Sequence, residues 1–385
     1  MTEPVTPESQ PFGGLEIAFL SWRDTHNPEG GGAERALEEV AEGLSARGAR
    51  VIVFSAAHAG APPEAEIRGV RYLRRGSKIS VYARGMQALR RGDLGQPDVV
   101  VDVQNGLPFF TRLVTRKPVI VLCHHVHREQ WPVVYPGFTG KVGWWIERRF
   151  APLLYRRSQY VTGSHATRDE LRLLGVDHRR IAVVHYGTER RRPVEVPKTD
   201  HPSICVVGRL VPHKQVEHAI DAILELRREL PDVVLTVVGS GWWEHRLHEY
   251  AQTRGAGDAV RFLGQVDDET KERVYEESWV LALPSLKEGW GLVVGEAGLA
   301  GTPAVAYASA GGTRESVVDG TSGLLVDDQA GFVEALRRVL TDEELRRRLA
   351  KGAMEHGGRY TWDQTRANFA EVVGTVLRGE RVSSR

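Results

Sequence analysis

The sequence predicts an α/β fold with two doubly wound domains, each built on a parallel sheet. Short apolar runs alternate with helical patterns in both halves of the chain. Runs such as 118–123 (PVIVLC) are apolar throughout, which is typical of strands buried on both faces of a parallel sheet. A charged, proline-bearing segment at 188–203 separates the two series, so the strand–helix repetition on either side indicates two separate units.

The first series supports a domain at residues 14–187. Residues 1–13 are polar and acidic, without the basic and apolar regions of a signal peptide, and we expect them to form a disordered lead. Helices are expected at 33–48 and 164–175. The expected strands are 15–20, 50–56, 98–103, 118–123, 160–163 and 181–185.

A linker is predicted at 188–202, where three prolines and several charges replace the apolar pattern. The pattern then restarts and predicts a second domain at 203–360, followed by a helix and tail at 361–385. The expected strands are 203–208, 233–239, 259–264, 279–285, 303–307 and 323–326. The expected helices are 216–230, 242–254, 268–277, one from about 291, and a stretch at 329–377 with breaks at 356–358.

Composition excludes several classes of protein. With 385 residues, 41% of them hydrophobic and 26% charged, the chain is not a disordered segment, a collagen or a coiled-coil rod. Cys123 and Cys205 lie in apolar runs and predict buried thiols of a reducing compartment, not a disulfide framework. No apolar run reaches the length of a membrane-spanning helix. We therefore expect a cytoplasmic protein.

Charge is unevenly distributed along the chain. Residues 1–200 carry 29 Lys and Arg against 22 Asp and Glu, whereas residues 201–385 carry 22 against 28. Opposite signs fit two domains that meet across a cleft, one of which also faces an anionic partner. The strongest local feature is the stretch 68–91, which holds eight basic residues and no acidic one.

A glycine-rich turn, GGGAER, follows the first expected strand at residues 30–35. Glycines let the backbone approach a ligand closely, and the start of the following helix offers unpaired N–H groups suited to phosphate. An ordinary glycine-rich turn between a strand and a helix is an equal alternative.

The second domain opens with VVGRLVPHK at 206–214. Its first strand ends at Gly208, and Arg209 and Lys214 follow at the carboxyl edge of the predicted sheet, where ligands of such folds bind. Two fixed cations there would hold a diphosphate and neutralise charge on a leaving phosphate. The alternative is a pair of solvated surface cations.

A third motif, PSLKEGWGLVVGEAGLAGTPAVA, holds Glu288 and Glu296 eight positions apart. The backbone N–H groups of Gly289, Trp290 and Gly291 precede a helix and suit an anion. Glu296 lies among Val, Gly and Ala, so its carboxylate needs a partner, and paired sugar hydroxyls are good ones. The alternatives are a helix N-cap for Glu288 and an exposed helix charge for Glu296.

His124, His125 and His127 follow the buried strand 118–123. No nearby cysteine or further histidine completes a zinc site, so a hydrogen bond to a polar ligand is expected of one histidine and a structural role of the others. Motifs of other enzyme classes are absent from the sequence. They are the hydrolase elbow GxSxG, the P-loop, the zinc-protease HExxH, and a strand-end DxD for a metal-bound diphosphate.

Together these motifs resemble those of the retaining glycosyltransferases of family 4, which have the GT-B fold. The resemblance covers nearly the whole chain and rests on GGAE, the strand-end histidine, GRLxxxK, PSxxEGxGLxxxEAxxxGxPxVA, and GGTRESVVDGTSGLLV at 311–326. It implies two Rossmann-like domains facing across a cleft, with a nucleotide sugar bound mainly by the second and an acceptor mainly by the first. It also implies a hinge near 188–203 and a C-terminal helix that crosses back toward the first domain.

The resemblance assigns roles residue by residue. Arg209 and Lys214 match a diphosphate clamp, and Glu296 matches a ribose-binding carboxylate. Glu288 and His124 match groups that touch the donor sugar. The remaining donor-binding positions are Gly31 and Gly32 toward the diphosphate or acceptor, Gln265 and Val266 toward the base, and Gly208, Gly289, Trp290, Gly291 and Leu292 around the diphosphate and sugar.

Two positions depart from the pattern of the family. Gln215 follows the clamp lysine, where the family commonly has glycine, and Trp290 stands where phenylalanine is usual. Neither departure changes the class of activity that the resemblance implies, but both reshape the expected pocket.

The implied reaction moves a hexose from a UDP- or GDP-linked sugar to a glycan, lipid-linked or small-molecule acceptor, in polysaccharide biosynthesis. No cofactor and no metal are expected, because Arg209 and Lys214 would neutralise the leaving diphosphate. No second carboxylate is placed as a nucleophile. This favours front-face transfer, in which the departing phosphate oxygen takes the acceptor proton. Competing interpretations are a nucleotide-sugar epimerase, a phosphorylase, and a catalytically inactive binder of sugar nucleotides.

The basic stretch 68–91 suits an anionic membrane surface, because apolar and aromatic residues are interleaved with its arginines. The segment 141–157 is similar in composition and could assist. A solvated face with ordinary core aromatics is an equal alternative, and no motif supports nucleic-acid binding. The first of these two alternatives predicts a peripheral position of the cytoplasmic protein at the inner face of the plasma membrane. The interleaved residues are Tyr72, Leu73, Ile79, Val81, Tyr82, Met86 and Leu89.

Overall fold

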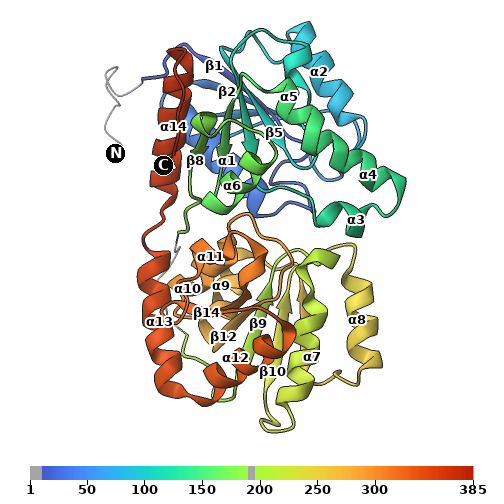
Figure 1. Ribbon diagram of the computed structural model, residues 1–385, viewed down its shortest axis with the longest axis vertical. Helices are drawn as coiled ribbons and strands as arrows, with labels where there is room; N and C mark the ends of the chain where they lie inside the picture. The colour runs from blue at the N-terminus through green and yellow to red at the C-terminus, as the bar shows by residue number, and fades with distance from the viewer. Residues whose placement is uncertain (1–10, 190–195, 385) are drawn as a thin grey trace. The chain divides into compact units, whose positions relative to one another are not determined.

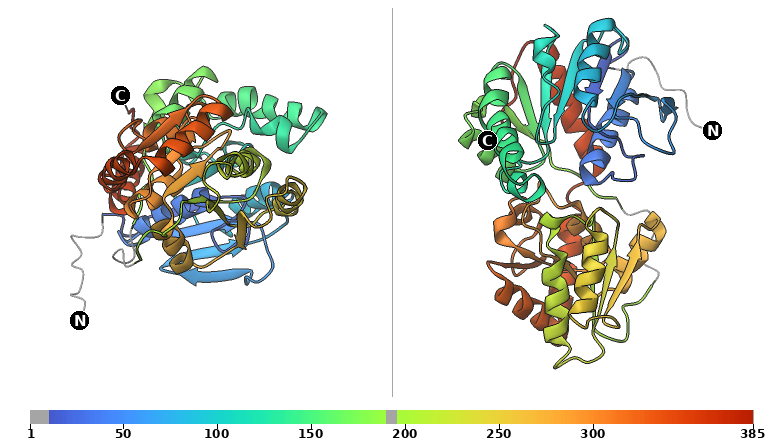
Figure 2. Two further views of the ribbon diagram at one scale, coloured as in Figure 1. Left: turned by 90° about the horizontal axis from the view of Figure 1, so that it is seen from below. Right: turned by 90° about the vertical axis from the view of Figure 1, so that its right-hand side faces the viewer.

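The computed structural model describes residues 11–189 and 196–384, which form two compact units. The first unit comprises the chain up to Trp131, residues 136–185, and residues from 362 onward; the second comprises 132–135 and 186–361. Each unit contains one large, mainly parallel sheet with helices on both of its faces (Figures 1 and 2). The predicted fold class, two doubly wound α/β units, is confirmed. Among the described residues, no helix is long and apolar enough to cross a membrane.

The sheet of the first unit has the order β3-β4-β2-β1-β5-β6-β7-β8. All neighbouring strands pair in parallel except β3, which pairs antiparallel with β4 at the sheet edge. The strands are β1 (Glu16–Leu20), β2 (Arg50–Ser55), β3 (Glu64–Ile67), β4 (Val70–Arg74), β5 (Val99–Gln104), β6 (Val119–Cys123), β7 (Gln159–Thr162) and β8 (Ile181–Val183). The sequence analysis missed β3 and β4, in which charged residues interrupt the apolar pattern.

Helices cover both faces of this sheet. On one face, α1 (Gly32–Ser45) and α14 (Trp362–Leu377) share a core with β1 and β2. On the other face, α2 (Val81–Arg91) and α6 (His165–Leu173) pack against a second core that includes Cys123. The chain-terminal α14 is therefore part of the first unit. Phe12 is buried in the α1 core, so the packed chain begins before residue 14, the expected start of the first domain. Residues 1–10 lie outside the described part.

The sheet of the second unit is entirely parallel and has the order β11-β10-β9-β12-β13-β14. The order reverses between β9 and β12, the point at which doubly wound sheets bind ligands beyond their carboxyl ends. The strands are β9 (Ser203–Val207), β10 (Val234–Val238), β11 (Val260–Gly264), β12 (Val280–Leu283), β13 (Ala304–Tyr307) and β14 (Gly323–Val326).

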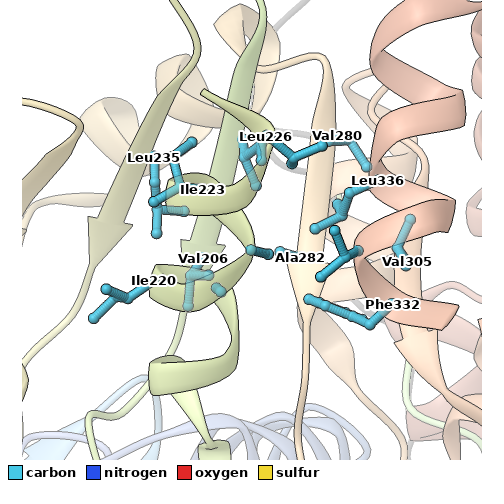
Figure 3. Close-up of a cluster of buried hydrophobic side chains, with 14 of the residues drawn as sticks. Val206, Ile220, Ile223, Leu226, Leu235, Val280, Ala282, Val305, Phe332 and Leu336 are labelled. Atoms are coloured by element: carbon cyan, nitrogen blue, oxygen red, sulfur yellow. The ribbon is translucent and has the colours of Figure 1, made fainter. Parts of the chain in front are cut away.

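Successive residues of β9 face opposite cores, as expected of a strand buried on both sides. Val206 points into a cluster with helices α7 (Val216–Leu226), α8 (Glu244–Thr253) and α12 (Gln329–Thr341) (Figure 3). Cys205 and Val207 face α9 (Asp268–Glu277) and α10 (Leu292–Leu299). The prediction of buried thiols is confirmed, since Cys123 and Cys205 are both buried and unbridged.

The helical stretch expected at 329–377 is divided into α12, α13 (Glu343–Gly357) and α14. Asp342 separates the first two, because its side chain accepts a hydrogen bond from the Leu345 N–H and caps α13. The chain leaves the second unit after Thr361, and α14 belongs to the first.

Part of the predicted linker 188–202, residues 190–195, lies outside the described residues. Its last part is packed against the second unit. The Lys198 ammonium donates to the Ser278 carbonyl (2.7 Å) and to the Thr302 hydroxyl (2.5 Å). Burial lowers the pKa of Lys198 to about 8.

Candidate functional site

The loop after β9 is held by close backbone contacts with the loop after β10. The Gly208 N–H donates to the Val238 carbonyl (3.0 Å), and the Leu210 N–H donates to the Ser240 carbonyl (2.9 Å). A Cβ on Gly239 would lie 2.0 Å from the Gly208 carbonyl oxygen, so this position accepts only glycine. These contacts fix the backbone on both sides of Arg209. The sequence analysis missed Gly239, although the GSG at 239–241 directly follows a strand.

Lys214 ends a short 3₁₀ turn, Pro212–Lys214, just before α7. Its ammonium donates to Glu288 Oε1 at 2.6 Å, and both side chains are mostly buried (20% and 9% exposed). The structure therefore brings together two residues 74 positions apart. Gln215 follows in the left-handed region, at φ 48°. This conformation explains why glycine suits the position after the lysine.

The loop that carries Glu288 is tied to two neighbouring loops. The Glu288 N–H donates to the Ala310 carbonyl (2.7 Å), and the Leu286 N–H donates to the His213 carbonyl (2.9 Å). A small pocket between the ends of β9 and β12 is lined by Arg209, Lys214 and Ser285, among others. The Ser285 hydroxyl is buried without a hydrogen-bond partner among the described residues. The pocket thus combines two cations with an unsatisfied hydroxyl.

Glu296, the second glutamate of the motif, is half-buried on α10 and held by two side chains of α9. Lys271 Nζ lies 3.3 Å from its Oε1, and the Tyr275 hydroxyl donates to its Oε2 at 2.9 Å. Burial first and the Glu296 carboxylate second raise the pKa of Tyr275 well above its usual value. Burial alone would lower the pKa of Lys271, but Glu296 and Asp268 outweigh it and the pKa is raised.

Lys271 and Tyr275 therefore supply the partners that the Glu296 carboxylate needs. From the sequence alone, sugar hydroxyls were the expected partners. Lys271 and Tyr275 were missed by the sequence analysis. They are four positions apart and thus share one face of α9. That spacing was visible in the sequence, but the packing of α9 on α10 was not.

The start of α10 is built by Gly289, Trp290 and Gly291, with Leu292 as its first helical residue. Gly291 adopts φ 88°, which favours glycine. Trp290 is buried and meets the ring of Tyr360 edge-on, with centroids 4.9 Å apart. This packing against Tyr360 accommodates the indole ring, which is larger than the phenylalanine ring usual at this position.

Gln265 and Val266, expected near the base, follow β11 at the same edge of the sheet. Gln265 is exposed, and its Oε1 lies 3.5 Å from the Ser240 hydroxyl. Val266 is half-buried and packs against the core around Cys205. Of the two, Gln265 is the one whose side chain is accessible to a ligand.

On the first unit, Gly31 caps α1 and Gly32 begins it. The Gly31 N–H donates to Glu34 Oε2 (2.8 Å), and Arg23 Nε donates to the other oxygen of Glu34 (2.6 Å). Arg23 and Glu34 are both buried. The sequence analysis included Glu34 in its motif without a role and missed Arg23 entirely.

His124 directly follows β6 and is 3% exposed. Burial lowers the pKa of His124 to about 4, with Glu34 opposing the shift and His127 and Arg23 adding to it. The ring is therefore neutral near neutral pH and can act as a hydrogen-bonding group.

The two neighbouring histidines are held by other protein groups. The His125 ring lies 3.1 Å from Gln130 Oε1 and stacks on His127. His127 lies between Asn105 Oδ1 (2.8 Å) and Glu147 Oε1 (3.3 Å). Both contacts fit the structural role expected of these histidines.

The basic stretch 68–91 differs from the surface that we expected. Tyr72, Leu73 and Val81 are buried in the core. Several arginines are paired with carboxylates: Arg68 with Glu42, Arg71 with Glu64, Arg74 with Asp24 and Arg75 with Asp93. The stretch is therefore divided between strand β4 and helix α2. Four of its cations are paired with carboxylates, whereas Ile79 is 86% exposed and Arg90 and Arg91 are exposed on α2.

Two family models match consecutive parts of the chain. The model described as Glycosyltransferase Family 4 matches residues 30–192, and the model described as Glycosyl transferases group 1 matches residues 187–356. Each model matches less than half of the chain, but together they cover residues 30–356, so the chain is similar to these glycosyltransferases over most of its length. The two matches meet near the boundary between the two units, so each model corresponds to about one unit.

Curated relatives are similar over part of their length. A D-inositol 3-phosphate glycosyltransferase of Streptomyces bingchenggensis is 34% identical over 236 residues, which are 55% of this chain and 52% of the relative. A glycogen synthase of Mycobacterium tuberculosis is 32% identical over 236 residues, 60% of this chain and 57% of the relative. The chain thus spans about half the length of the curated relatives it matches.

Solved structures share the fold over nearly the whole chain. A sucrose-phosphate synthase from Thermosynechococcus elongatus has a TM-score of 0.81 at 20% identity and covers 95% of this chain and 100% of its own. HepE of Anabaena, solved with UDP and glucose, has a TM-score of 0.72 at 19% identity and covers 94% and 99%. These likenesses confirm the fold.

Proposed function

We propose that this chain is a retaining glycosyltransferase that moves a hexose from a UDP- or GDP-linked sugar to a hydroxyl of a glycan, lipid-linked or small-molecule acceptor. The observation that carries the proposal is the convergence of Arg209, Lys214 and Glu288 at the strand-order reversal of the second sheet. The matches to the two glycosyltransferase family models support it, as does the likeness to HepE, whose structure contains UDP and glucose.

In this proposal Lys214 exchanges partners when the donor binds. Its ammonium is paired with Glu288. A diphosphate carries more negative charge than one carboxylate, so it competes for the ammonium, while Arg209 offers a planar set of N–H donors beside it. Glu288 is then free to accept hydrogen bonds from hydroxyls of the donor sugar. The two cations act in place of a metal at the diphosphate.

Glu296 is assigned to the ribose hydroxyls. Lys271 contacts Oε1 of this carboxylate and Tyr275 contacts Oε2, so each residue occupies one lone pair of one oxygen. The two contacts fix the orientation of the carboxylate. Each oxygen keeps a second lone pair for a ribose hydroxyl. Lys271 and Tyr275 are thus positioning residues in this account.

The chemical step breaks the bond between the anomeric carbon and the diphosphate through a state resembling an oxocarbenium ion. Arg209 and Lys214 stabilise the negative charge that grows on the leaving oxygen. The acceptor oxygen attacks from the same face, and its proton passes to the departing phosphate. His124, with Gly31 and Gly32, is assigned to the sugar and acceptor side, where a neutral ring donates or accepts a hydrogen bond.

The proposal is tested with a panel of UDP-glucose, UDP-N-acetylglucosamine and GDP-mannose, each with simple sugar and polyol acceptors and with EDTA present. We expect release of a nucleoside diphosphate from one donor, and NMR of the product should show that the anomeric configuration of the donor is kept. An inverted product, a strict requirement for a metal, or no turnover with any donor contradicts the proposal.

A further inference from the structure

Residues 138–157 form a helical arm on the first unit, hereafter the arm. It consists of α4 (Phe138–Trp145), a π-helical turn (Ile146–Phe150), α5 (Ala151–Leu154) and the residues that follow. In Figure 1, α4 lies at the margin of its unit, away from the strands of the sheet.

The inner side of the arm is fixed by two contacts. Gly143 lies against the ring of Trp131, so closely that a Cβ would come within 2.3 Å of a ring carbon. Glu147 is fully buried and accepts hydrogen bonds from Trp131 Nε1 (2.7 Å) and from the His127 N–H (3.1 Å). Because these residues face inward, the opposite side of the helix must face outward.

The outer side of the arm carries large apolar side chains. Phe138 is 80% exposed, Val142 38%, Trp145 58% and Leu153 64%. The first three are spaced by four and three positions, so they form one stripe along α4. Such a concentration of exposed aromatic and aliphatic side chains marks an interaction surface.

The exposed charges of the arm are all positive. Its only acidic residue is the buried Glu147. Within the described residues, none of its exposed cations makes an ion pair, in contrast to the arginines at 68–75. The exposed cations are Lys141, Arg148, Arg149, Arg156 and Arg157.

We propose that the arm docks on the surface of an anionic lipid bilayer. The apolar stripe would enter the boundary between headgroups and acyl chains, and the unpaired cations would face the anionic headgroups, as in interfacial amphipathic helices. A second copy of the chain is a poorer partner, because a symmetric contact would place the same unpaired cations opposite one another. Charge complementarity therefore favours an anionic membrane as the partner. The arm replaces the stretch 68–91 as the proposed membrane-binding surface.

Docking there has a consequence for the first unit. Glu147 connects the arm to His127, in the loop that begins with His124 at the carboxyl end of β6. A bilayer under the arm therefore lies beside the loop assigned to the acceptor side. This placement suits an acceptor carried by a lipid. The docking itself does not rest on the proposed function.

The test is sedimentation of the full chain with vesicles, without any sugar nucleotide, so that its failure leaves the proposed function standing. One set of vesicles is pure phosphatidylcholine, and the other is an equal mixture with phosphatidylglycerol. We expect binding to the mixed vesicles alone. R148E with R149E, and separately F138S with W145S, should each lower the partition coefficient by at least about tenfold.

R90E with R91E is the matched control, because both arginines are exposed on α2 within the stretch 68–91. This variant should lose much less binding than the arm variants, although it changes the net charge equally. Equal binding to both kinds of vesicle overturns the proposal, as does an equal loss in the control and arm variants. Absence of vesicle binding, or a dimer seen by sedimentation velocity and abolished by the arm variants, also overturns it. Circular dichroism of each variant confirms that the helices are retained.

Discussion

The carboxyl edges of the two sheets hold their charges in different ways. In the second unit, Lys214 and Glu288 form an ion pair that stays partly accessible, and the cation lines a pocket. In the first unit, Asp24 accepts from Arg74 Nε (2.8 Å) and both are almost fully buried. An accessible pair can exchange its partner for a ligand, whereas a buried pair cannot be broken without leaving an uncompensated charge. The Asp24–Arg74 pair is thus a fixed part of the scaffold, whereas the Lys214–Glu288 pair belongs to the proposed binding site.

The largest expected effect tests the scaffold. Asp24→Ala removes the acceptor of Arg74 and of the Ser55 hydroxyl (2.7 Å). Because the guanidinium then stays buried and unpaired, the free energy of unfolding of the first unit should fall by about 3–5 kcal/mol. Lys214→Ala should cost less, about 1–3 kcal/mol in the second unit, because Glu288 loses its cation but the pair is not fully buried. Denaturant titration followed by circular dichroism measures both, and equal losses would remove the distinction between the two edges.

The next effect tests the binding edge through activity. Arg209→Ala should lower the rate of sugar transfer by roughly 10²–10³-fold, because one donor to the leaving phosphate is lost. Its thermal midpoint should stay close to that of the wild type. Arg261→Ala removes an exposed arginine from β11 and is the matched control, which should keep the rate. A rate for Arg209→Ala near that of the control would show that the cation plays no part in the reaction.

The scaffold should also lose stability in acid because of His124. Its folded pKa of about 4 lies below the ordinary value of 6.5. The unfolded chain therefore binds the extra proton first, and stability falls as the pH drops from about 6.5 to about 4. The contribution of this group is about 3 kcal/mol across that window. His124→Gln should flatten this part of the profile of unfolding free energy against pH, and an unchanged slope would contradict the assignment.

The smallest effect concerns the backbone of the binding edge. Gln215 adopts φ 48°, a conformation that costs a non-glycine residue about 1 kcal/mol. Gln215→Gly should therefore raise the stability of the second unit by up to about 1 kcal/mol, whereas Gln215→Ala should bring no gain. The thermal midpoints of the two variants are the measurement. An equal gain in thermal midpoint with alanine and glycine would show that the gain comes from removing the Gln215 side chain and not from relieving backbone strain.

Much of this architecture could be predicted from the sequence, because buried parallel strands such as β6 and β9 are apolar throughout. The strand β4 could not, since Arg71 and Arg74 interrupt its pattern and Arg74 is buried only because Asp24 lies beside it. The motif residues at the carboxyl edges were found because strand ends and glycines mark them.

The partners of those motif residues were harder to find. Lys271 and Tyr275 support Glu296 from another helix, and Asp24 and Arg74 are 50 positions apart. Pairs of this kind depend on which loops the topology places side by side. Composition and spacing carry no such information until the strand order is known.

The central claim is that the site at the carboxyl ends of β9 and β12 binds a nucleoside diphosphate. The most direct test is calorimetric titration with UDP, GDP, ADP and dTDP, with and without Mg²⁺, on the wild type, Arg209→Ala and Glu296→Gln. The account predicts a clear preference for UDP or GDP, no dependence on the metal, and weaker binding in both variants. Absence of binding to all four nucleotides, or binding that neither substitution weakens, would contradict it.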